Sequence, residues 1–284
     1  MKRSILFILA LAALLSSQAA TKRALVIGIG DYPATSGWAK INGDKDIPMV
    51  EEMLIANGFS KQNIVELKNQ QATCTAICRE FENLIASAQK GDYVYIHFSG
   101  HGQQITDLNG DEDEGLDEAW IPYDAQFAYA KGKYEGQNHL IDDQLNQYFH
   151  RVREKIGTEG KIVIVADACH SGGGSRAEEE DSITYVVRGT SDAFVIPSPK
   201  KVSAPTLYPI EWTFISACKP YQCNYEYKGN GSLTYALYQQ RTNFSSLSAK
   251  QIRQKVGSCI ANIIPFTQTP VLEVTSGKET DIFL

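Results

Sequence analysis

The chain has 284 residues, of which 43% are hydrophobic and 21% charged, and its formal net charge is −6. It is long enough for one large domain or two small ones. An acidic chain without a basic stripe is unlike a nucleic-acid-binding protein, so nucleic acid is excluded as the expected partner.

The first twenty residues have the pattern of a secretory signal peptide. A basic start, Met1-Lys2-Arg3, precedes the apolar run 4–16 and the small residues of "SQAA", with cleavage expected after Ala19 or Ala20. The run is shorter than the ~18 apolar residues of a membrane anchor. We therefore expect a signal peptide over 1–20, no stable membrane insertion, and a secreted or periplasmic protein. Losing Lys2 and Arg3 would take the net charge from −6 to −8.

Apolar strands alternate with amphipathic helices along the rest of the chain. The strands are predicted at 23–30, 63–67, 91–102, 161–168 and 211–217, and the helices at 46–58, 73–89, 142–157 (with Asp142 as N-cap), 232–240 and 248–263, before the closing segment 270–274. This order predicts an α/β fold with a mostly parallel sheet and helices on both faces. In such sheets the functional site lies beyond the carboxyl ends of the strands.

Several familiar site patterns are absent from the sequence. Gly28-Ile29-Gly30 lacks the third glycine of a dinucleotide loop, because position 33 is Pro33. Neither Ser99 nor Ser171 has the flanking glycines of a serine hydrolase elbow. No paired CxxC and no HExxH motif indicates zinc. The six cysteines of an exported protein suggest disulfides, and the close pairs Cys74/Cys78 and Cys218/Cys223 stay open candidates.

Two polar residues come directly after predicted strands. His101 follows the third strand between Gly100 and Gly102, and Cys169 follows the fourth strand. If these strands are parallel neighbours, both side chains reach the same sheet edge, where an imidazole can activate a thiol. His97 is expected to be an ordinary strand histidine, and His170 to have a supporting role because adjacent side chains at a turn point apart. A free cysteine is by itself more often a buried core residue.

The segments around these residues resemble a known family. "HFSGHG" (97–102) and "DACHSG" (167–172), with "FISACKPYQCNYE" (214–226) and "QTPVL" (268–272), resemble the caspase-like cysteine peptidases of the metacaspase branch. The resemblance covers 22–284 and implies a caspase-like fold with a six-stranded sheet. It divides the domain into a large-subunit-like part (22–176), a linker (177–208) and a small-subunit-like part (209–284).

The resemblance also implies roles for single residues. Cys169 matches the nucleophile and His101 the general base and acid, while the N–H groups of Gly102 and Cys169 would form the oxyanion hole. Asp167, Asp46 and Ser99 match an acidic pocket, which implies protein or peptide substrates cleaved after Arg or Lys. The alternative for Asp46 is a helix N-terminal residue that interacts with the helix dipole.

A calcium site is a further implication. The acidic segment 107–118 is not an EF-hand, because Glu112 stands where the loop needs glycine. The family resemblance instead matches Asp117, Asp142 and Asp143 to calcium ligands and puts Arg176 at the fourth position, with Glu178 as a substitute. Calcium is therefore a possible cofactor, and none is needed for the peptidase chemistry.

The linker and the assembly state complete the expectations. Arg188-Gly189 and Lys200-Lys201 are candidate self-cleavage points, against the simpler alternative of a disordered loop. By analogy with the family we expect a monomer. The competing functions are a catalytically silent module that binds peptide or calcium, and a peptidase of the clostripain or gingipain type.

Overall fold

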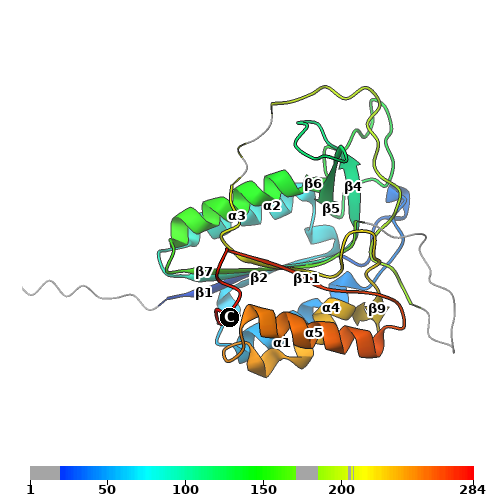
Figure 1. Ribbon diagram of the computed structural model, residues 1–284. Coiled ribbons are helices and arrows are strands. Elements are labelled where there is room, and N and C mark those ends of the chain that lie inside the picture. The colour runs from blue at the N-terminus through cyan, green and yellow to red at the C-terminus, as the bar shows by residue number, and fades with distance from the viewer. Residues whose placement is uncertain (1–19, 171–184, 204–205, 207) are drawn as a thin grey trace, which may run out of the picture.

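A six-stranded sheet forms the centre of the molecule (Figure 1). The computed structural model describes residues 20–170, 185–203, 206 and 208–284, so nearly all of the predicted signal peptide lies outside it. The strand order is β11-β8-β7-β3-β1-β2, in which only β11 runs antiparallel to its neighbour. The strands are β1 (Lys22–Gly28), β2 (Ile64–Lys68), β3 (Tyr93–Ser99), β7 (Lys161–Asp167), β8 (Thr213–Ser216) and β11 (Val271–Val274).

Helices cover both faces of this sheet, as Figure 1 shows. One face carries α2 (Cys74–Ser87) and α3 (Asp142–Ile156), and the other carries α1 (Ile47–Ala56), α4 (Ser232–Gln239) and α5 (Ala249–Ile263). Each face has its own apolar core, and β7 is buried from Ile162 to Asp167, as a central parallel strand must be. The predicted α/β class is confirmed.

A small second sheet stands at the carboxyl ends of the main strands. Two of its strands, β4 (Gly102–Thr106) and β5 (Leu116–Trp120), flank the acidic turn and were not predicted, and β5 pairs with both β4 and β6 (Leu140–Ile141). Most of the acidic residues lie in the turn between β4 and β5. Their number made the short strands on either side hard to recognise in the sequence. The expected N-cap of α3 is also wrong by one residue, because Ile141 is the N-cap and Asp142 begins the helix.

The described part of the linker packs against this second sheet. Phe194 donates its N–H to the Gln104 carbonyl at 2.7 Å and accepts from Thr106 N at 3.1 Å, which extends the open edge of β4. The expectation of a disordered loop is therefore wrong for residues around 185–196, whereas Lys200 and Lys201 are exposed. Across the described residues, no helix has both the length and the hydropathy that crossing a bilayer requires.

Candidate active site

The ends of β3 and β7 bring the two motifs together. Ser99, the last residue of β3, pairs with Asp167, the last residue of β7. After each strand the backbone leaves the sheet within two residues, at His101 and at Cys169. A side chain on Gly102 would meet the Cys169 carbonyl oxygen at 2.7 Å, so glycine is required for this close approach. The expectation that two parallel neighbours deliver both residues to one edge therefore agrees with the structure.

His101 is held in its neutral form by groups that the sequence did not reveal. Its Nε2 lies 2.9 Å from the Ala39 carbonyl oxygen, which can only accept, so Nε2 carries the proton and Nδ1 keeps a lone pair. Burial lowers the pKa of His101 to about 4, despite the hydrogen bond to Ala39. The ring stacks on Trp38 at a centroid distance of 4.8 Å. The backbone N–H of His101 donates to the Tyr32 hydroxyl. Nδ1 has no hydrogen-bond partner among the described residues.

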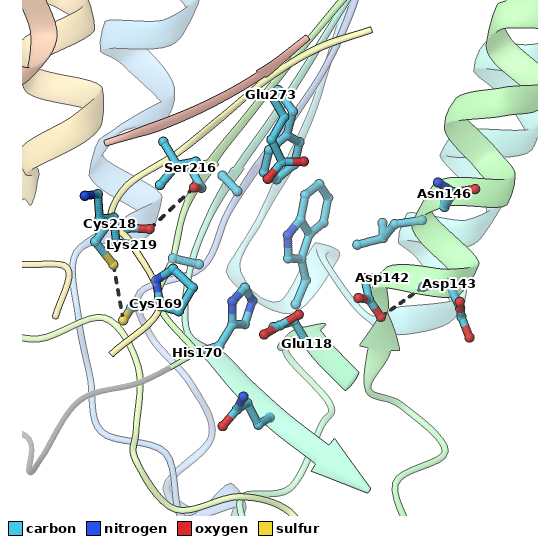
Figure 2. A pocket seen from close by; sticks show the side chains of 18 of the residues that line it. Glu118, Asp142, Asp143, Asn146, Cys169, His170, Ser216, Cys218, Lys219 and Glu273 are labelled. Atoms are coloured by element: carbon cyan, nitrogen blue, oxygen red, sulfur yellow. Dashed lines mark hydrogen bonds between the residues drawn. The ribbon is translucent and has the colours of Figure 1, made fainter. Parts of the chain in front are cut away.

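Cys169 is 2% exposed and contacts two other segments. Its backbone N–H donates to the Arg188 carbonyl oxygen at 2.8 Å, and its Sγ lies 2.8 Å from the Gln222 carbonyl oxygen. A second thiol, that of Cys218, lies 3.5 Å from the same sulfur (Figure 2). The neighbouring His170 is half-buried, and its Nε2, which is shielded from solvent, has no partner in the described part of the chain. Burial lowers the pKa of His170 to about 4.

A buried cluster of acidic side chains, called here the acidic pocket, lies beside the ends of β3 and β7. It contains the predicted residues Asp46, Asp167 and Ser99, with the Ser99 hydroxyl donating to Asp46 at 2.8 Å. Asp46 is the N-cap residue of α1 but makes no side-chain cap hydrogen bond, and its carboxylate accepts from the Ser99 hydroxyl and the Gly231 N–H instead. Sequence reasoning missed a third carboxylate, Glu226 of β9 (Glu226–Tyr227), because nothing in the local pattern sets it apart.

The walls of this pocket hold its carboxylates in place. Asp167 accepts from the backbone N–H and hydroxyl of Thr234, at 2.7 and 2.6 Å, and from Asn224 Nδ2 at 2.7 Å. His97, expected to be an ordinary packed histidine, is fully buried, and its Nε2 lies 3.0 Å from the Ser99 hydroxyl and 3.1 Å from that of Thr234. These contacts fix the orientation of both aspartates.

The side chain that fills the pocket is Arg188 of the linker. It is 0% exposed, and its Nη1 lies 2.6 Å from Asp46 Oδ2 and 3.6 Å from Asp167 Oδ1. Its Nε lies 3.0 Å from Glu226 Oε1. Although burial opposes the charge, the three carboxylates raise the pKa of Arg188 above its ordinary value. In return, Arg188 holds the pKa of Asp46 below its ordinary value even though burial acts to raise it.

The backbone around Arg188 is extended like a bound peptide. The Arg188 N–H donates to the Asn224 carbonyl at 2.9 Å, and the Val186 carbonyl accepts from Glu226 N at 2.8 Å. Val187 and Tyr225 thus form an antiparallel bridge. The next residue, Gly189, lies so close to Cys169 that a Cβ on it would be 2.0 Å from the Cys169 carbonyl oxygen.

The carboxylates that lie together at the turn before β5 differ from the calcium ligands expected from the sequence. Oxygen atoms of Asp107, Asp111 and Asp117 lie within 4.8 Å of one another. Burial, and repulsion by its acidic neighbours, raises the pKa of Asp117 to about 7, and the same causes raise that of Asp142 to about 8. Asp143 approaches this cluster through a hydrogen bond from Asn109 at 2.5 Å. Arg176 and Glu178 lie outside the described residues.

Comparison with known proteins decides the family. The model of the metacaspase peptidase C14 domain matches residues 22–175, just over half of the chain, including both motifs. The chain belongs to the metacaspase family. Metacaspase-8 of Arabidopsis thaliana is 34% identical over 161 residues, which are 54% of this chain and 37% of the relative. Metacaspase-1 of Candida albicans is 34% identical over 164 residues, or 53% and 33% of the two chains.

The curated relatives are longer than this chain, whereas one solved structure matches nearly all of it. This metacaspase spans about a third of the length of the curated relatives it matches. A crystal structure of a protein from Geobacter sulfurreducens superposes with a TM-score of 0.63 at 20% identity, covering 92% of this chain and 97% of that one. At that identity the similarity supports the fold, which agrees with the expected caspase-like architecture.

Proposed function

We propose that this metacaspase is a cysteine endopeptidase that cleaves peptide bonds after Arg or Lys. The observation that carries the proposal is Arg188, whose guanidinium lies among three buried carboxylates while its carbonyl oxygen accepts from Cys169 N. A substrate residue before the scissile bond needs this combination: a charge partner for its side chain and an N–H donor for its carbonyl.

The chemistry follows from the two residues at the sheet edge. His101, neutral and with a free lone pair at Nδ1, takes the proton of the Cys169 thiol as the sulfur attacks the carbonyl carbon. The N–H groups of Cys169 and Gly102 stabilise the oxyanion, each by about 3 kcal/mol. His101 then protonates the leaving amine, and water hydrolyses the thioester. The Ala39 carbonyl stabilises the imidazolium that forms in between.

Self-cleavage between Arg188 and Gly189 belongs to the same proposal. Until this bond is cut, Arg188 fills the pocket and competes with any substrate from outside. Cutting it frees the linker to leave, after which the acidic pocket is open. The exposed pair Lys200-Lys201 lacks such a pocket contact and is the weaker candidate.

Calcium binding and export are two further parts of the proposal. Oxygen donors are the ligands that Ca²⁺ prefers, and the cluster of Asp107, Asp111 and Asp117 supplies three, with Asp142 and Asp143 nearby. A bound cation would relieve the repulsion among these carboxylates. Export rests on the N-terminal pattern of residues 1–20, and cell fractionation with N-terminal sequencing of the product tests it.

A panel of fluorogenic peptides tests the peptidase. Purified protein, with and without calcium, is incubated with peptides that end in Arg, Lys or Asp, beside the Cys169→Ala variant. We expect release from the Arg and Lys peptides by the wild type only. On gels the wild-type chain should separate into two fragments, of which the first ends at Arg188 and the second begins at Gly189. No release from any peptide by a folded wild-type protein favours the catalytically silent module, and faster release from the Asp peptide contradicts the assigned pocket.

A further inference from the structure

A second cysteine lies beside the nucleophile. Cys218 follows β8, the strand next to β7, and its Sγ is 3.5 Å from Cys169 Sγ. Both sulfurs also approach one backbone oxygen, that of Gln222, at 2.8 Å from Cys169 and 3.2 Å from Cys218. The two thiols are therefore held together by the sheet and by a shared carbonyl, although they are 49 residues apart in the chain.

The strand pairing brings the chain segments of these two cysteines close together. Ala166 pairs with Ser216, and Ala217 N donates to the Ala166 carbonyl at 3.1 Å, so the last ladder contact lies one residue before Cys218 and three residues before Cys169. Continued to the two cysteines, strands about 4.8 Å apart with an offset of one residue of about 3.3 Å correspond to a Cα separation of roughly 5.8 Å. Disulfides span Cα separations of about 4.4–6.8 Å. Closing the bond needs side-chain rotation and no rearrangement of the sheet.

Both cysteines line one cavity that is large enough for a small molecule. Cys169 and Cys218 line a cavity of about 420 Å³ between α3, β5 and the ends of β7 and β8, together with His170 (Figure 2). Arg188 and Gly189 contact the backbone of Cys169 and are not among the residues that line this cavity. A peroxide in the cavity can thus reach Cys169 while Arg188 stays among the three carboxylates.

We propose that Cys218 is the resolving thiol of Cys169 and that peroxide converts the pair into a reversible disulfide. The Cys169 thiolate attacks hydrogen peroxide, the O–O bond breaks, and Cys169 becomes a sulfenic acid with release of hydroxide. The Cys218 sulfur then attacks the Cys169 sulfur, and the S–O bond breaks as the Cys218 proton and the departing hydroxide form water. In total, two thiols and one peroxide give one disulfide and two waters.

The disulfide has two consequences for Cys169. It removes the nucleophile while it lasts, and it protects the sulfur from oxidation to sulfinic acid, which thiol reductants do not reverse. The loss and recovery of activity rest on the proposed function, whereas the disulfide itself rests only on the geometry of the two thiols. A dithiol reductant restores both thiols by exchange.

Peptide mapping under non-reducing conditions tests this proposal. Wild-type protein is treated with hydrogen peroxide, alkylated, digested without reduction and analysed by mass spectrometry. We expect a linked pair of peptides containing Cys169 and Cys218, which dithiothreitol separates, with recovery of at least four-fifths of the peptidase activity. In Cys218→Ser and Cys218→Ala we expect Cys169 sulfinic acid instead, and less than a tenth of the activity recovered by the same reductant.

Cys223→Ser is the matched control, because Cys223 is the other thiol close to Cys218. It should form the Cys169–Cys218 link as the wild type does. Wild-type protein in which Cys169 becomes sulfinic acid while Cys218 stays a free thiol, or in which Cys223 forms the link, overturns the proposal. A chain that forms the expected link but cleaves no peptide when reduced overturns the proposed function and leaves the resolving role of Cys218 standing.

Discussion

Replacing Arg188 by glutamine removes the only cation that the described structure places among Asp46, Asp167 and Glu226. The side chain is 0% exposed, and its nitrogens approach these carboxylates at 2.6, 3.6 and 3.0 Å. Glutamine retains polar contacts but leaves the carboxylates without a compensating charge. We make the change in a Cys169→Ala background, so that self-cleavage cannot alter the chain being measured.

The expected cost is large because the group left behind is buried and charged. Removing one partner of a buried ion pair typically lowers the free energy of unfolding by about 3–5 kcal/mol. For a chain of this size, each kcal/mol corresponds to a shift in Tm of about 2–4 °C. Arg188→Gln should therefore lower Tm by roughly 6–20 °C at pH 7.5.

The loss of Tm caused by Arg188→Gln should become smaller as the pH falls. In the wild type, Arg188 holds the pKa of Asp46 down against burial, while burial raises that of Asp167 despite Arg188. Without the guanidinium, both carboxyl pKa values rise in the folded state, which then binds protons that the unfolded chain releases. The penalty is fully present above the raised pKa values and is relieved as the pH falls through them.

Differential scanning fluorimetry at pH 7.5 and pH 5.0 measures both effects. Arg153→Gln in the same background is the matched control, because this partly buried guanidinium donates to the backbone carbonyls of Gly157, Gly160 and Glu211 rather than to carboxylates. Its Tm loss should be the same at both pH values. An Arg188→Gln variant whose Tm equals that of its parent, or whose loss is as large at pH 5.0 as at pH 7.5, would refute the reasoning.

Three further predictions concern single groups. Glu226→Gln should reduce kcat/KM for Arg peptides at least tenfold more than for Lys peptides, since Glu226 contacts the guanidinium Nε and lysine has no such donor; equal losses in peptidase assays would count against this. Calcium should raise the Tm of the wild type but not of Asp117→Asn, and its affinity by titration calorimetry should weaken below pH 7, where Asp117, whose pKa burial raises to about 7, takes up a proton; a pH-independent affinity would contradict the assignment. His139→Gln should lower the proton uptake on unfolding at pH 5.5 by about one, because burial lowers the pKa of His139 to about 4 and the unfolded ring is mostly protonated there; an uptake equal to that of the wild type, measured from the pH dependence of urea denaturation, would argue against a buried neutral ring.

The sheet, its helices and the sheet edge that carries the candidate site could be predicted from the sequence. Strands and amphipathic helices place apolar residues at a fixed spacing over a short stretch of chain, so their pattern can be recognised in the sequence. The motifs around His101 and Cys169 carried the family resemblance, and Asp46, Asp167 and Ser99 followed from it. The short strands β4 and β5 escaped prediction because the acidic turn between them dominates that stretch of sequence.

The groups that fill and complete the candidate site could be identified only from the packing of distant segments. Arg188 meets Asp46 across 142 positions, and His101 meets the Ala39 carbonyl across 62. Cys218 reaches Cys169 because β8 lies beside β7. Such partners leave no local periodicity, since each contact depends on how distant segments pack and on which backbone groups that packing exposes. The candidate site residues could be recognised from motifs in the sequence, whereas their contact partners depend on how segments pack at the sheet edge.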